Sequence, residues 1–527
     1  MSQRRARVAL VGPGDQNNLG LGYLAAVLGR AGHAVDVIDS NRDDREVIGE
    51  LREIRPDLIG FSLIFQFHMS RLGAMVGRVR DAMPRVHLTV GGHFPSLRPQ
   101  ELLEHIPQLD SIVRFEGELT LLDLTDRVVA GQDWTTTPGI AYRSGREVVL
   151  APLRELIPDL DSIPYPVRKR STYSILGRSA DTLIGSRGCA RRCSFCSIHT
   201  FYRSSPGLAV RFREPRAVVE EMRHLHVDSG VEVFLFQDDN FPLSGRRGRS
   251  WVDQFLTSMR KAGLYGRVLF KINCRVDDVE DSLFESLRDA GLFLVYLGIE
   301  SGTPAGLKLF HKQVTVDQVH RAAATLRALD LAFNYGYMLV HPATTLDSLR
   351  QDLRFLAELT APGDVAVSFC RMIPYAGTPI REQLETQGRL TGDIENPSYA
   401  LLSPQVERFH ARLHSLAGPW LSDGLSQELN YAHTEVRVLR RLHLPIPEEE
   451  VDAYHDRLKE LTRESNGSLL RTVTELIDEA EGAVGDSRVH QVSIRSAVSG
   501  MQSQVQAHRE GFISQYADVI LGGMEGG

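Results

Sequence analysis

Three cysteines in one short loop constrain the fold of this chain more than any other feature of its sequence. They stand in C-x3-C-x2-C spacing at Cys189, Cys193 and Cys196, directly after an apolar segment, residues 182–184, that predicts a strand. Thiolates are the soft ligands that iron–sulfur clusters require. Three of them on one loop can hold three irons of a four-iron cube and leave the fourth iron open. The alternative is a zinc ion bound by the same cysteines and His199.

The composition is that of an ordinary globular protein. A chain of 527 residues has room for about three domains. Its 42% hydrophobic and 24% charged residues argue against wholesale disorder, and a net charge of −7 argues against a nucleic-acid partner. No apolar run reaches the ~18–20 residues that span a bilayer, and the start lacks the apolar region of a signal peptide. We therefore expect a cytoplasmic protein with no membrane span.

Apolar strands alternate with helices in the first part of the chain. The predicted strands are residues 7–12, 34–39, 58–64, 87–92 and 111–115. This alternation predicts a parallel sheet covered on both faces, a doubly wound Rossmann-like domain over residues 1–138. The ligand of such a domain lies at the carboxyl ends of the strands. The first turn, Gly12-Pro13-Gly14, does not fit the G-x-G-x-x-G pattern of nicotinamide-binding domains.

Residues 139–180 predict a hairpin that turns at Ser144-Gly145, followed by a proline-rich linker. The alternation then resumes over residues 181–388. Strands are predicted at residues 182–185, 231–237, 268–273, 293–298, 332–339 and 365–372. Six β/α units are too few for a closed barrel of eight, so we expect an open partial (β/α)6 barrel with its site at the carboxyl ends of the strands.

Residues 389–527 predict a mostly helical domain. Helices are expected at residues 404–417, 448–464, 468–481 and 489–517, with breaks at Pro445-Ile446-Pro447 and Asn466-Gly467. The overall prediction is an α/β protein with three domains joined by one linker.

The cysteine loop, with aromatic Phe195 just before its last cysteine, resembles the cluster loop of the radical SAM (S-adenosylmethionine) superfamily. The order of motifs before it resembles the cobalamin-binding domain that precedes the radical domain in one radical SAM subfamily. Together the two resemblances run from about residue 7 to residue 385. They imply an enzyme with a [4Fe-4S] cluster, SAM and cobalamin, similar to the class B, cobalamin-dependent radical SAM methyltransferases.

The resemblance assigns residues at several strand ends to SAM. Besides Phe195, the positions that match family motifs are Gln237, Asp238, Asp239, Arg275, Glu300 and Ser301. The carboxylates suit the ammonium of the methionyl part, and Arg275 suits its carboxylate. Capping of a loop is the alternative for Asp238 and Asp239. Cys274 and Cys370 are interpreted as buried residues that behave like apolar ones.

The resemblance also assigns strand-end residues of the first domain to cobalamin. These are Pro13, Asp15, Asn17, Asn18, Gly20, Ser62, Gly91, Gly92, His93, Glu116 and Gly117. One position departs from the family pattern, because Asn17 stands where many cobalamin domains have the histidine of D-x-H-x-x-G. An amide is a poor ligand for cobalt, so we expect cobalamin with no histidine as its lower ligand. The alternative is that Asn17 caps the next helix.

The resemblance implies that one SAM is cleaved to a 5′-deoxyadenosyl radical, which takes a hydrogen from a small molecule or peptide. Methylcobalamin then methylates the resulting unactivated carbon or phosphinate phosphorus, and a second SAM restores the methyl group. An external flavodoxin- or ferredoxin-like protein would supply electrons. A second hypothesis is ring contraction or cyclisation without methyl transfer. A third is a non-catalytic module that senses cobalamin, with a structural metal on the cysteines.

Overall fold

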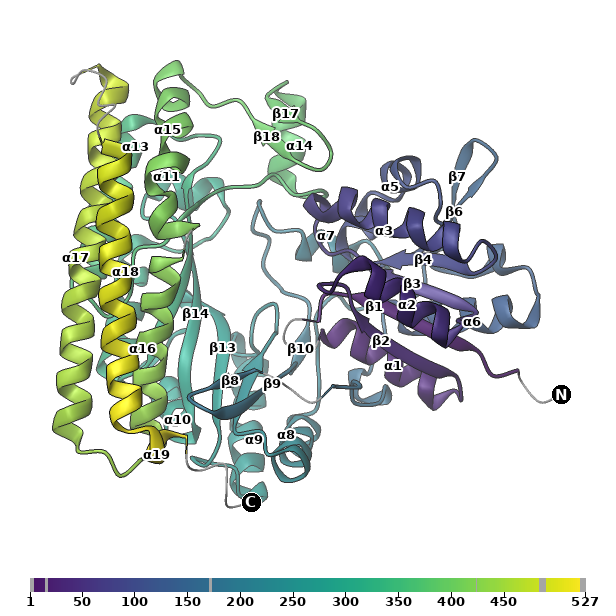
Figure 1. The fold of residues 1–527 in the computed structure, drawn as a ribbon, viewed down its shortest axis with the longest axis horizontal. Coiled ribbons are helices and arrows are strands. Elements are labelled where there is room, and N and C mark those ends of the chain that lie inside the picture. The colour runs from purple at the N-terminus through teal and green to yellow at the C-terminus, as the bar shows by residue number, and fades with distance from the viewer. Residues whose placement is uncertain (1–3, 15–17, 170–172, 423, 483–489, 522–527) are drawn as a thin grey trace. The chain divides into compact units, whose positions relative to one another are not determined.

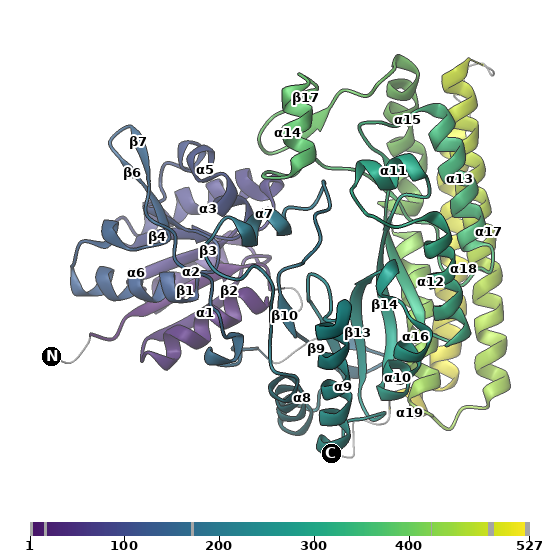
Figure 2. The same ribbon diagram turned by 180° about the vertical axis from the view of Figure 1, so that it is seen from behind.

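The computed structural model describes residues 4–14, 18–169, 173–422, 424–482 and 490–521. The chain forms two compact units, whose elements are labelled in Figure 1 and seen from behind in Figure 2. The first unit consists of Met1–Ser171, Asp181–Glu221 and Pro374–Ser398, and the second of Thr172–Ala180, Met222–Ile373 and Tyr399–Gly527. The cysteine loop thus belongs to the same unit as the N-terminal strands. Among the described residues, no helix combines the length and the apolar character needed to cross a membrane.

A seven-stranded sheet forms the centre of the first unit. Its strands, in spatial order, are β2 (Ala34–Asp39), β1 (Arg7–Gly12), β3 (Leu58–Ser62), β4 (His87–Gly91), β5 (Ser111–Val113), β6 (Ile140–Ser144) and β7 (Glu147–Leu150). The first five strands pair in parallel, which confirms the predicted doubly wound arrangement. The predicted hairpin, β6 and β7, extends this sheet with antiparallel pairing.

Helices cover both faces of this sheet because its strands are apolar on both sides. The helices are α1 (Leu19–Arg30), α2 (Asp44–Ile54), α3 (Met69–Ala82), α4 (His93–Leu97), α5 (Pro99–His105) and α6 (Glu118–Ala130). Val8 and Leu10 of β1 share a core with α1 and α6. Ala9 and Val11 share a second core with α2, α3 and α5. Period-two burial along β1 therefore separates the two cores.

The order of the strands places a crevice beside β1. Because β1 lies between β2 and β3, helices α1 and α2, which follow β1 and β2, pack on opposite faces of the sheet. Such a reversal opens a crevice at the carboxyl ends of the two strands where it occurs, here β1 and β3.

Another seven-stranded sheet lies in the second unit, except for its residues 181–183, which belong to the first. In spatial order its strands are β16 (Cys370–Arg371), β15 (Ala332–Val340), β14 (Leu292–Glu300), β13 (Leu269–Arg275), β12 (Val233–Phe236), β9 (Arg178–Leu183) and β8 (Ser174–Ile175). Strands β12 to β16 are parallel. The helices of the β/α repeat are α8 (Pro215–Ser229), α9 (Gly245–Ala262), α10 (Asp281–Ala290), α11 (Pro304–Leu309), α12 (Val316–Ala328) and α13 (Leu346–Thr360). This is the predicted open half-barrel.

The last strand of this sheet is much shorter than residues 365–372, the range that the sequence predicted. Side chains from the helical layer bind the backbone that would have formed its first half. The Asn466 side chain accepts a hydrogen bond from Val367 N (2.7 Å) and donates one to Val365 O (3.0 Å). These backbone groups are therefore not available for a strand ladder, and pairing begins only at β16.

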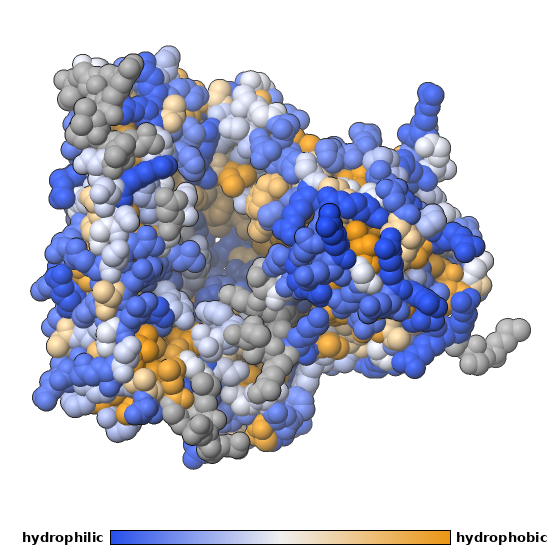
Figure 3. All heavy atoms as spheres, viewed as in Figure 1, coloured by the Kyte–Doolittle hydropathy of each residue, from blue (hydrophilic) through white to orange (hydrophobic). Residues whose placement is uncertain are grey.

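A layer of long helices completes the second unit. Its members are α15 (Pro404–Leu421), α16 (Leu425–Arg441), α17 (Glu448–Glu481), α18 (His490–Gln515) and α19 (Ala517–Ile520). Helices α15 to α18 lie side by side in Figures 1 and 2, and Figure 3 shows mostly hydrophilic side chains on the face of this layer that it presents. The sequence pattern does not predict α16, because buried polar residues such as His433 and Glu435 interrupt its apolar face.

The predicted break at Asn466-Gly467 is wrong, because α17 runs without interruption over 34 residues. Glycine in a helix interior costs only about 1 kcal/mol relative to alanine. The two hydrogen bonds of the buried Asn466 side chain to residues 365 and 367 offset that cost. Long-range contacts thus override the local preference of the Asn-Gly pair for a turn.

Neighbouring substitutions in α17 should have opposite effects on stability. We expect Asn466→Ala to lower the free energy of unfolding by about 2–4 kcal/mol, because a buried N–H and a buried C=O both lose their partner. We expect Gly467→Ala to raise it by about 0.5–1 kcal/mol, since a β-carbon there meets only the flexible end of Arg471, at 3.2 Å. Urea unfolding followed by circular dichroism measures both changes. Equal effects of the two substitutions would contradict this explanation.

Candidate functional site

The cysteine loop lies between two short paired strands. The elements around it are β10 (Ser186–Arg187), α7 (Ile198–Arg203) and β11 (Arg211–Phe212). Strands β10 and β11 pair antiparallel, with Arg187 opposite Arg211. All three cysteines are half-buried, and Cys196 N donates a hydrogen bond to Cys193 O (3.2 Å). Phe195 lies half-buried between these two cysteines. The paired strands thus hold the three thiols on one closed loop.

A glycine fixes the start of the loop. Gly188 has a φ of +85°, and a β-carbon at this position would lie 1.9 Å from the carbonyl oxygen of Ala209, so only glycine fits. Among the described residues, no three His, Cys, Asp or Glu side chains converge on one metal ion. Each cysteine of a four-iron cube binds a different iron, so a cluster does not need such convergence. The donor set and the loop therefore fit a cluster.

The carboxylate of Glu116 joins both strands that flank the loop. Arg187 Nη1 donates to Glu116 Oε1 (3.0 Å), and Arg211 donates through its two terminal nitrogens to Oε2 and Oε1 (2.8 Å each). The backbone N–H of Ile157 donates to Oε2 as well (2.9 Å). Arg187 has a second partner in Glu118 (2.6 Å). The resemblance assigned Glu116 to cobalamin, whereas the structure engages both its oxygens with the cysteine-loop hairpin.

This ion network is buried. The exposed fractions of the Glu116, Arg187 and Arg211 side chains are 7%, 11% and 2%. Burial alone would raise the pKa of Glu116, but the Arg211 hydrogen bonds and the Arg187 charge lower it overall. The carboxylate therefore stays ionised between two guanidinium groups. Sequence reasoning missed both arginines because nothing local marks their partner.

An aromatic stack makes a second contact between the strand ends and the loop segment. The His93 ring stacks on Phe201 of α7, with centroids 4.1 Å apart and planes at 7°. Phe115 contacts Phe201 at 5.2 Å and 60°. Gly92, which precedes His93, has a φ of +124°, and a β-carbon there would lie 2.2 Å from the Leu63 carbonyl oxygen. Burial lowers the pKa of His93 to about 4, so its imidazole is neutral at pH 7.

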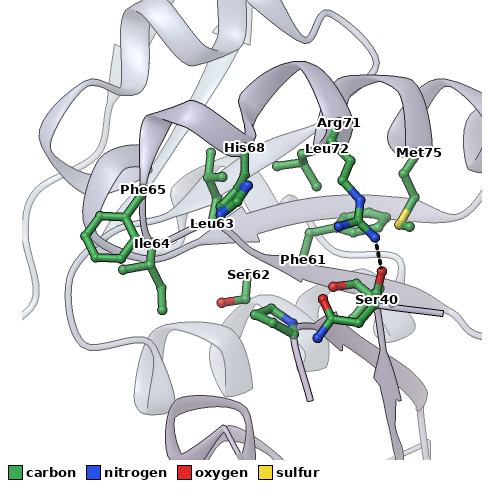
Figure 4. Close-up of a pocket in the computed structure, with 13 residues that line it drawn as sticks. Ser40, Phe61, Ser62, Leu63, Ile64, Phe65, His68, Arg71, Leu72 and Met75 are labelled. Carbon is green, nitrogen blue, oxygen red and sulfur yellow. Dashed lines mark hydrogen bonds between the residues drawn. The ribbon is translucent and has the colours of Figure 1, made fainter. Parts of the chain in front are cut away.

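A cavity of about 360 Å³ opens at the carboxyl ends of β1 and β3, at the crevice that the strand order creates. Figure 4 shows its side chains; the apolar ones are Val11, Pro13, Phe61, Leu63, Ile64, Phe65, Leu72 and Met75. Its polar side includes Ser40, whose carbonyl accepts a hydrogen bond from Arg71 Nη2 (2.7 Å). Pro13 and Ser62, which the resemblance assigned to cobalamin, both line this cavity.

The other residues assigned to cobalamin have varied settings. Asn18 caps α1, because its side chain accepts from Leu21 N (3.2 Å) and donates to Pro13 O (3.0 Å). Asp15 and Asn17 lie outside the described residues. The remaining assigned glycines stand at the ends of elements: Gly20 in the first turn of α1, Gly91 at the end of β4 and Gly117 before α6.

In the second unit, Glu300 presents a carboxylate at the end of β14. Its φ of +72° is rare for a residue other than glycine, and the pairing of β14 with β15 shifts register between Gly298 and Glu300. Lys312 Nζ lies 3.5 Å from the carboxylate and has only 3% of its side chain exposed. Burial raises the pKa of Glu300, and Lys312 opposes that shift. Strained residues of this kind cluster at functional sites.

Two further titratable side chains lie near Glu300. A β-carbon at Gly336 would meet the Tyr296 hydroxyl at 2.9 Å and Glu300 Oε2 at 3.1 Å, which explains the glycine. Burial and the Glu300 charge raise the pKa of the Cys370 thiol to about 11 and that of Tyr296 to about 12. The interpretation of Cys370 as a buried residue is wrong, because the residue as a whole is exposed at the short strand β16. Its thiol is the enclosed part and lies 3.5 Å from the carbonyl oxygen of Tyr337. Cys274 is buried as expected.

The residues predicted to bind the methionyl part of SAM lie directly after β12 and at the end of β13. Asp238 is buried, while Gln237 and Asp239 beside it are exposed. Arg275 is 5% exposed, and its Nε donates to Asp277 Oδ1 (2.8 Å). The guanidinium of Arg275 is therefore already bound within the protein.

Ser301 lies beneath the turn that follows β14. Its hydroxyl is 3.2 Å from Thr303 Oγ1 and 3.5 Å from Asp352 Oδ1. The Tyr337 hydroxyl donates to the same Asp352 oxygen (2.5 Å) and accepts from Gly302 N (2.8 Å). Burial raises the pKa of Asp352 to about 6, against the effect of these hydrogen bonds. These contacts give Ser301 a role in supporting the turn, and its contact with SAM stays a prediction.

Two family models match the chain one after the other. The B12 binding domain matches residues 7–125, and the Radical SAM superfamily matches residues 183–356. The first match covers β1 to β5, and the second covers the cysteine loop and the half-barrel through β15. The chain belongs to the cobalamin-dependent radical SAM enzymes.

The curated relatives of this enzyme include a methyltransferase and a cyclase. The chain is 27% identical over 370 residues to an uncharacterized methyltransferase of Pyrococcus horikoshii, covering 69% of this chain and 77% of the relative. It is also 27% identical over 379 residues to an anaerobic magnesium-protoporphyrin IX monomethyl ester cyclase of Cereibacter sphaeroides, covering 69% of this chain and 60% of the cyclase.

Solved structures share the fold of this enzyme. The cobalamin-dependent SAM radical enzyme OxsB with aqua-cobalamin bound superposes with a TM-score of 0.69 at 16% identity, covering 98% of this chain and 85% of OxsB. The radical SAM methyltransferase TsrM of Kitasatospora setae, with tryptophan substrate and a SAM analog bound, superposes with a TM-score of 0.62 at 20% identity, covering 72% of this chain and 76% of TsrM.

The two family domains imply that this radical SAM enzyme uses a [4Fe-4S] cluster, SAM and cobalamin. The residues present fit these groups. Cys189, Cys193 and Cys196 share one glycine-started loop, the strand-end cavity of the first unit has apolar walls and polar edges, and Glu300 ends a barrel strand.

Burial of neutral His93 should make the stability of this enzyme depend on pH. Its folded-state pKa of about 4 lies below the ordinary 6.5, so between these values the unfolded chain takes up a proton that the folded chain does not. Stability from this residue is therefore complete above pH 6.5 and is lost as pH falls. We expect His93→Phe, which keeps an aromatic ring against Phe201, to remove about 2 kcal/mol of the difference in unfolding free energy between pH 7.5 and pH 5.

Urea unfolding at the two pH values measures this effect. Substitution of the exposed His105 by Gln is the control, and its pH dependence should match that of the unaltered chain. A pH dependence unchanged by His93→Phe would contradict a His93 that stays neutral in the folded chain.

Proposed function

We propose that this enzyme methylates an unactivated carbon, or a phosphinate phosphorus, of a small molecule or peptide. One observation carries the proposal: the cysteine loop and the cobalamin-type strand ends form one compact unit, joined by Glu116. Radical methylation needs a site that generates a substrate radical and a methyl donor held in a fixed arrangement. The methyltransferase name of the Pyrococcus relative supports the same reaction.

Each cofactor has residues suited to hold it. Cys189, Cys193 and Cys196 would bind three irons and leave the fourth to the amino and carboxylate groups of SAM. When bound, the cluster supplies the electron that cleaves SAM, and cobalamin supplies the methyl group. The protein starts the loop at Gly188 and holds the Glu300 carboxylate at a strand end.

The SAM-binding residues would contribute charge and orientation. The Glu300 carboxylate, held by buried Lys312, would accept hydrogen bonds from ribose hydroxyls, and Asp238 would attract the methionyl ammonium. Arg275 would bind the methionyl carboxylate only if it gave up part of its hydrogen bonding to Asp277. Phe195, Gln237, Asp239 and Ser301 complete the proposed SAM site.

Cobalamin would bind with no histidine below its cobalt. The sequence has Asn17 at the position of the family histidine. The cavity at the carboxyl ends of β1 and β3 would hold the nucleotide base of cobalamin. Its apolar walls suit that base, and polar groups such as Ser62 suit the attached sugar phosphate. His93, Gly91 and Gly92 would lie along the same edge of the sheet.

The chain would divide its work among four segments. Residues 1–138 would bind cobalamin, residues 139–180 would link the domains, residues 181–388 would carry the cluster and SAM, and residues 389–527 would enclose the substrate. Electrons would come from an external flavodoxin- or ferredoxin-like donor. The boundaries follow the sequence patterns given above, and the electron donor follows from the family resemblance.

A second candidate function is a radical cyclisation or ring contraction without methyl transfer. The cyclase relative of Cereibacter sphaeroides favours it, because it matches the same share of this chain as the methyltransferase relative does. The two functions differ in the fate of SAM. Methylation yields S-adenosylhomocysteine and 5′-deoxyadenosine, whereas the second function requires only 5′-deoxyadenosine.

The decisive experiment uses the full chain, reconstituted without oxygen with iron, sulfide and hydroxocobalamin and then desalted. We expect cluster and corrin absorption together and, after dithionite and SAM are added, both 5′-deoxyadenosine and S-adenosylhomocysteine. Cys193→Ala should keep the fold and the corrin bands but lose the cluster and at least about 100-fold in 5′-deoxyadenosine. Cys274→Ala, a buried cysteine outside the loop, is the control and should keep its iron.

Three outcomes would change the assignment. 5′-Deoxyadenosine without S-adenosylhomocysteine favours the second function. Cluster absorption without corrin absorption would exclude cobalamin from both candidate functions. If Cys193→Ala unfolds while Cys274→Ala does not, the metal is structural and the third, non-catalytic hypothesis gains support.

A further inference from the structure

The loop that carries the cysteines is attached to the first unit at both of its ends. Arg187 stands immediately before Gly188 and Arg211 lies opposite it on the returning strand. Both guanidinium groups converge on the single carboxylate of Glu116. Arg211 also donates to the carbonyl of Ile157 (2.8 Å), whose N–H binds Glu116. The hairpin, the linker segment and the end of β5 thus share one set of hydrogen bonds.

The charges make this attachment specific. Guanidinium groups stay protonated, so the nearly buried Arg187 and Arg211 need anionic partners. Arg187 has Glu116 and Glu118, while Glu116 is the carboxylate that Arg211 binds through two nitrogens. The ring of Tyr23 also faces Arg187, 5.1 Å from its guanidinium carbon. Neutralising Glu116 would therefore disturb both strands at the base of the loop.

The stack of His93 on Phe201 points to the same connection by a separate contact. Phe201 lies in α7, five positions beyond Cys196, and His93 follows the Gly91-Gly92 pair of β4. A change in the backbone at these glycines would move the ring that packs on α7. Two strand ends of the cobalamin-binding domain, β4 and β5, therefore contact the cysteine-loop segment on either side of its cysteines.

We propose that Glu116 is a positioning residue that couples cluster assembly on the cysteine loop to cobalamin binding in the first unit. Assembly of the cluster orders the loop, and the loop in turn orders the strand ends at Glu116 and His93. Cobalamin binding at those strand ends then requires less ordering. By linkage, each cofactor increases the affinity of the other by the same factor. This inference rests on the cofactor set of the proposed function.

The test measures hydroxocobalamin affinity by equilibrium dialysis, for the full chain with and without its cluster. We expect the cluster to tighten binding at least about 5-fold in the unaltered chain. In Glu116→Gln, the affinity of the cluster-free protein should stay within about 2-fold of the unaltered one, and the gain on cluster assembly should vanish. If Glu116 instead contacted cobalamin directly, Glu116→Gln would lose the same affinity with the cluster as without it.

Glu221→Gln is the matched control. Glu221 is also a fully buried carboxylate of the first unit, bound to Arg168 (2.6 Å) and to Arg213, the residue after β11, but it binds neither Arg187 nor Arg211. We expect this variant to lose stability yet keep the full gain in affinity on cluster assembly. If Glu116→Gln fails to fold, Glu118→Gln replaces it, since it removes one bond to Arg187, and should show a partial loss of the gain.

The outcomes separate this inference from the proposed function. Coupling in the unaltered chain that is lost in Glu116→Gln but kept in Glu221→Gln supports it. Binding of both cofactors without coupling, an equal loss of affinity in both forms of Glu116→Gln, or the same loss of coupling in Glu221→Gln overturns it. Failure to bind either cofactor overturns the proposed function itself.

Discussion

One buried carboxylate determines where the cysteine loop can lie. Arg187 and Arg211 cannot lose their charge, and a buried ion without its partner costs about 3–5 kcal/mol. Both arginines point to Glu116, so the β10–β11 hairpin can close only against the end of β5. The cysteine loop lies in the segment that connects the two strands of that hairpin. Its position therefore follows from an ion network of the cobalamin-binding domain, which explains why the loop groups with the N-terminal strands rather than with the barrel.

The sequence identified these functional segments more readily than their contacts. Runs of apolar residues between polar turns predicted the strands of both sheets, because burial on two faces leaves a strong pattern. The motif that contains Glu116 was also visible. Its partners, Arg187 and Arg211, stand 71 and 95 residues away, and no local pattern marks a pairing over such distances. The same holds for Lys312 as the partner of Glu300.

Two errors in the predicted fold share one cause. Local propensity predicts a helix break at Asn466 and a strand over residues 365–372. In the structure the side chain of Asn466 explains why both predictions are wrong. Its amide binds backbone groups of residues 365 and 367, which stabilises the helix at Asn466 and leaves fewer backbone groups for the strand. Hydrogen bonds of this kind, in which a distant side chain replaces a backbone partner, leave no pattern in the local sequence.

Both key carboxylates stand at a sharp turn of the backbone at the end of a strand. Phe115, directly before Glu116, has a φ of +61°, and Glu300 itself has a φ of +72°. Such conformations cost about 1–3 kcal/mol each in residues other than glycine. At each site a buried cation opposes that cost, Arg211 for Glu116 and Lys312 for Glu300. At each site the ion pair holds the carboxylate in place. Sheet topology thus brings the functional residues to the strand ends, and buried charge fixes how they point.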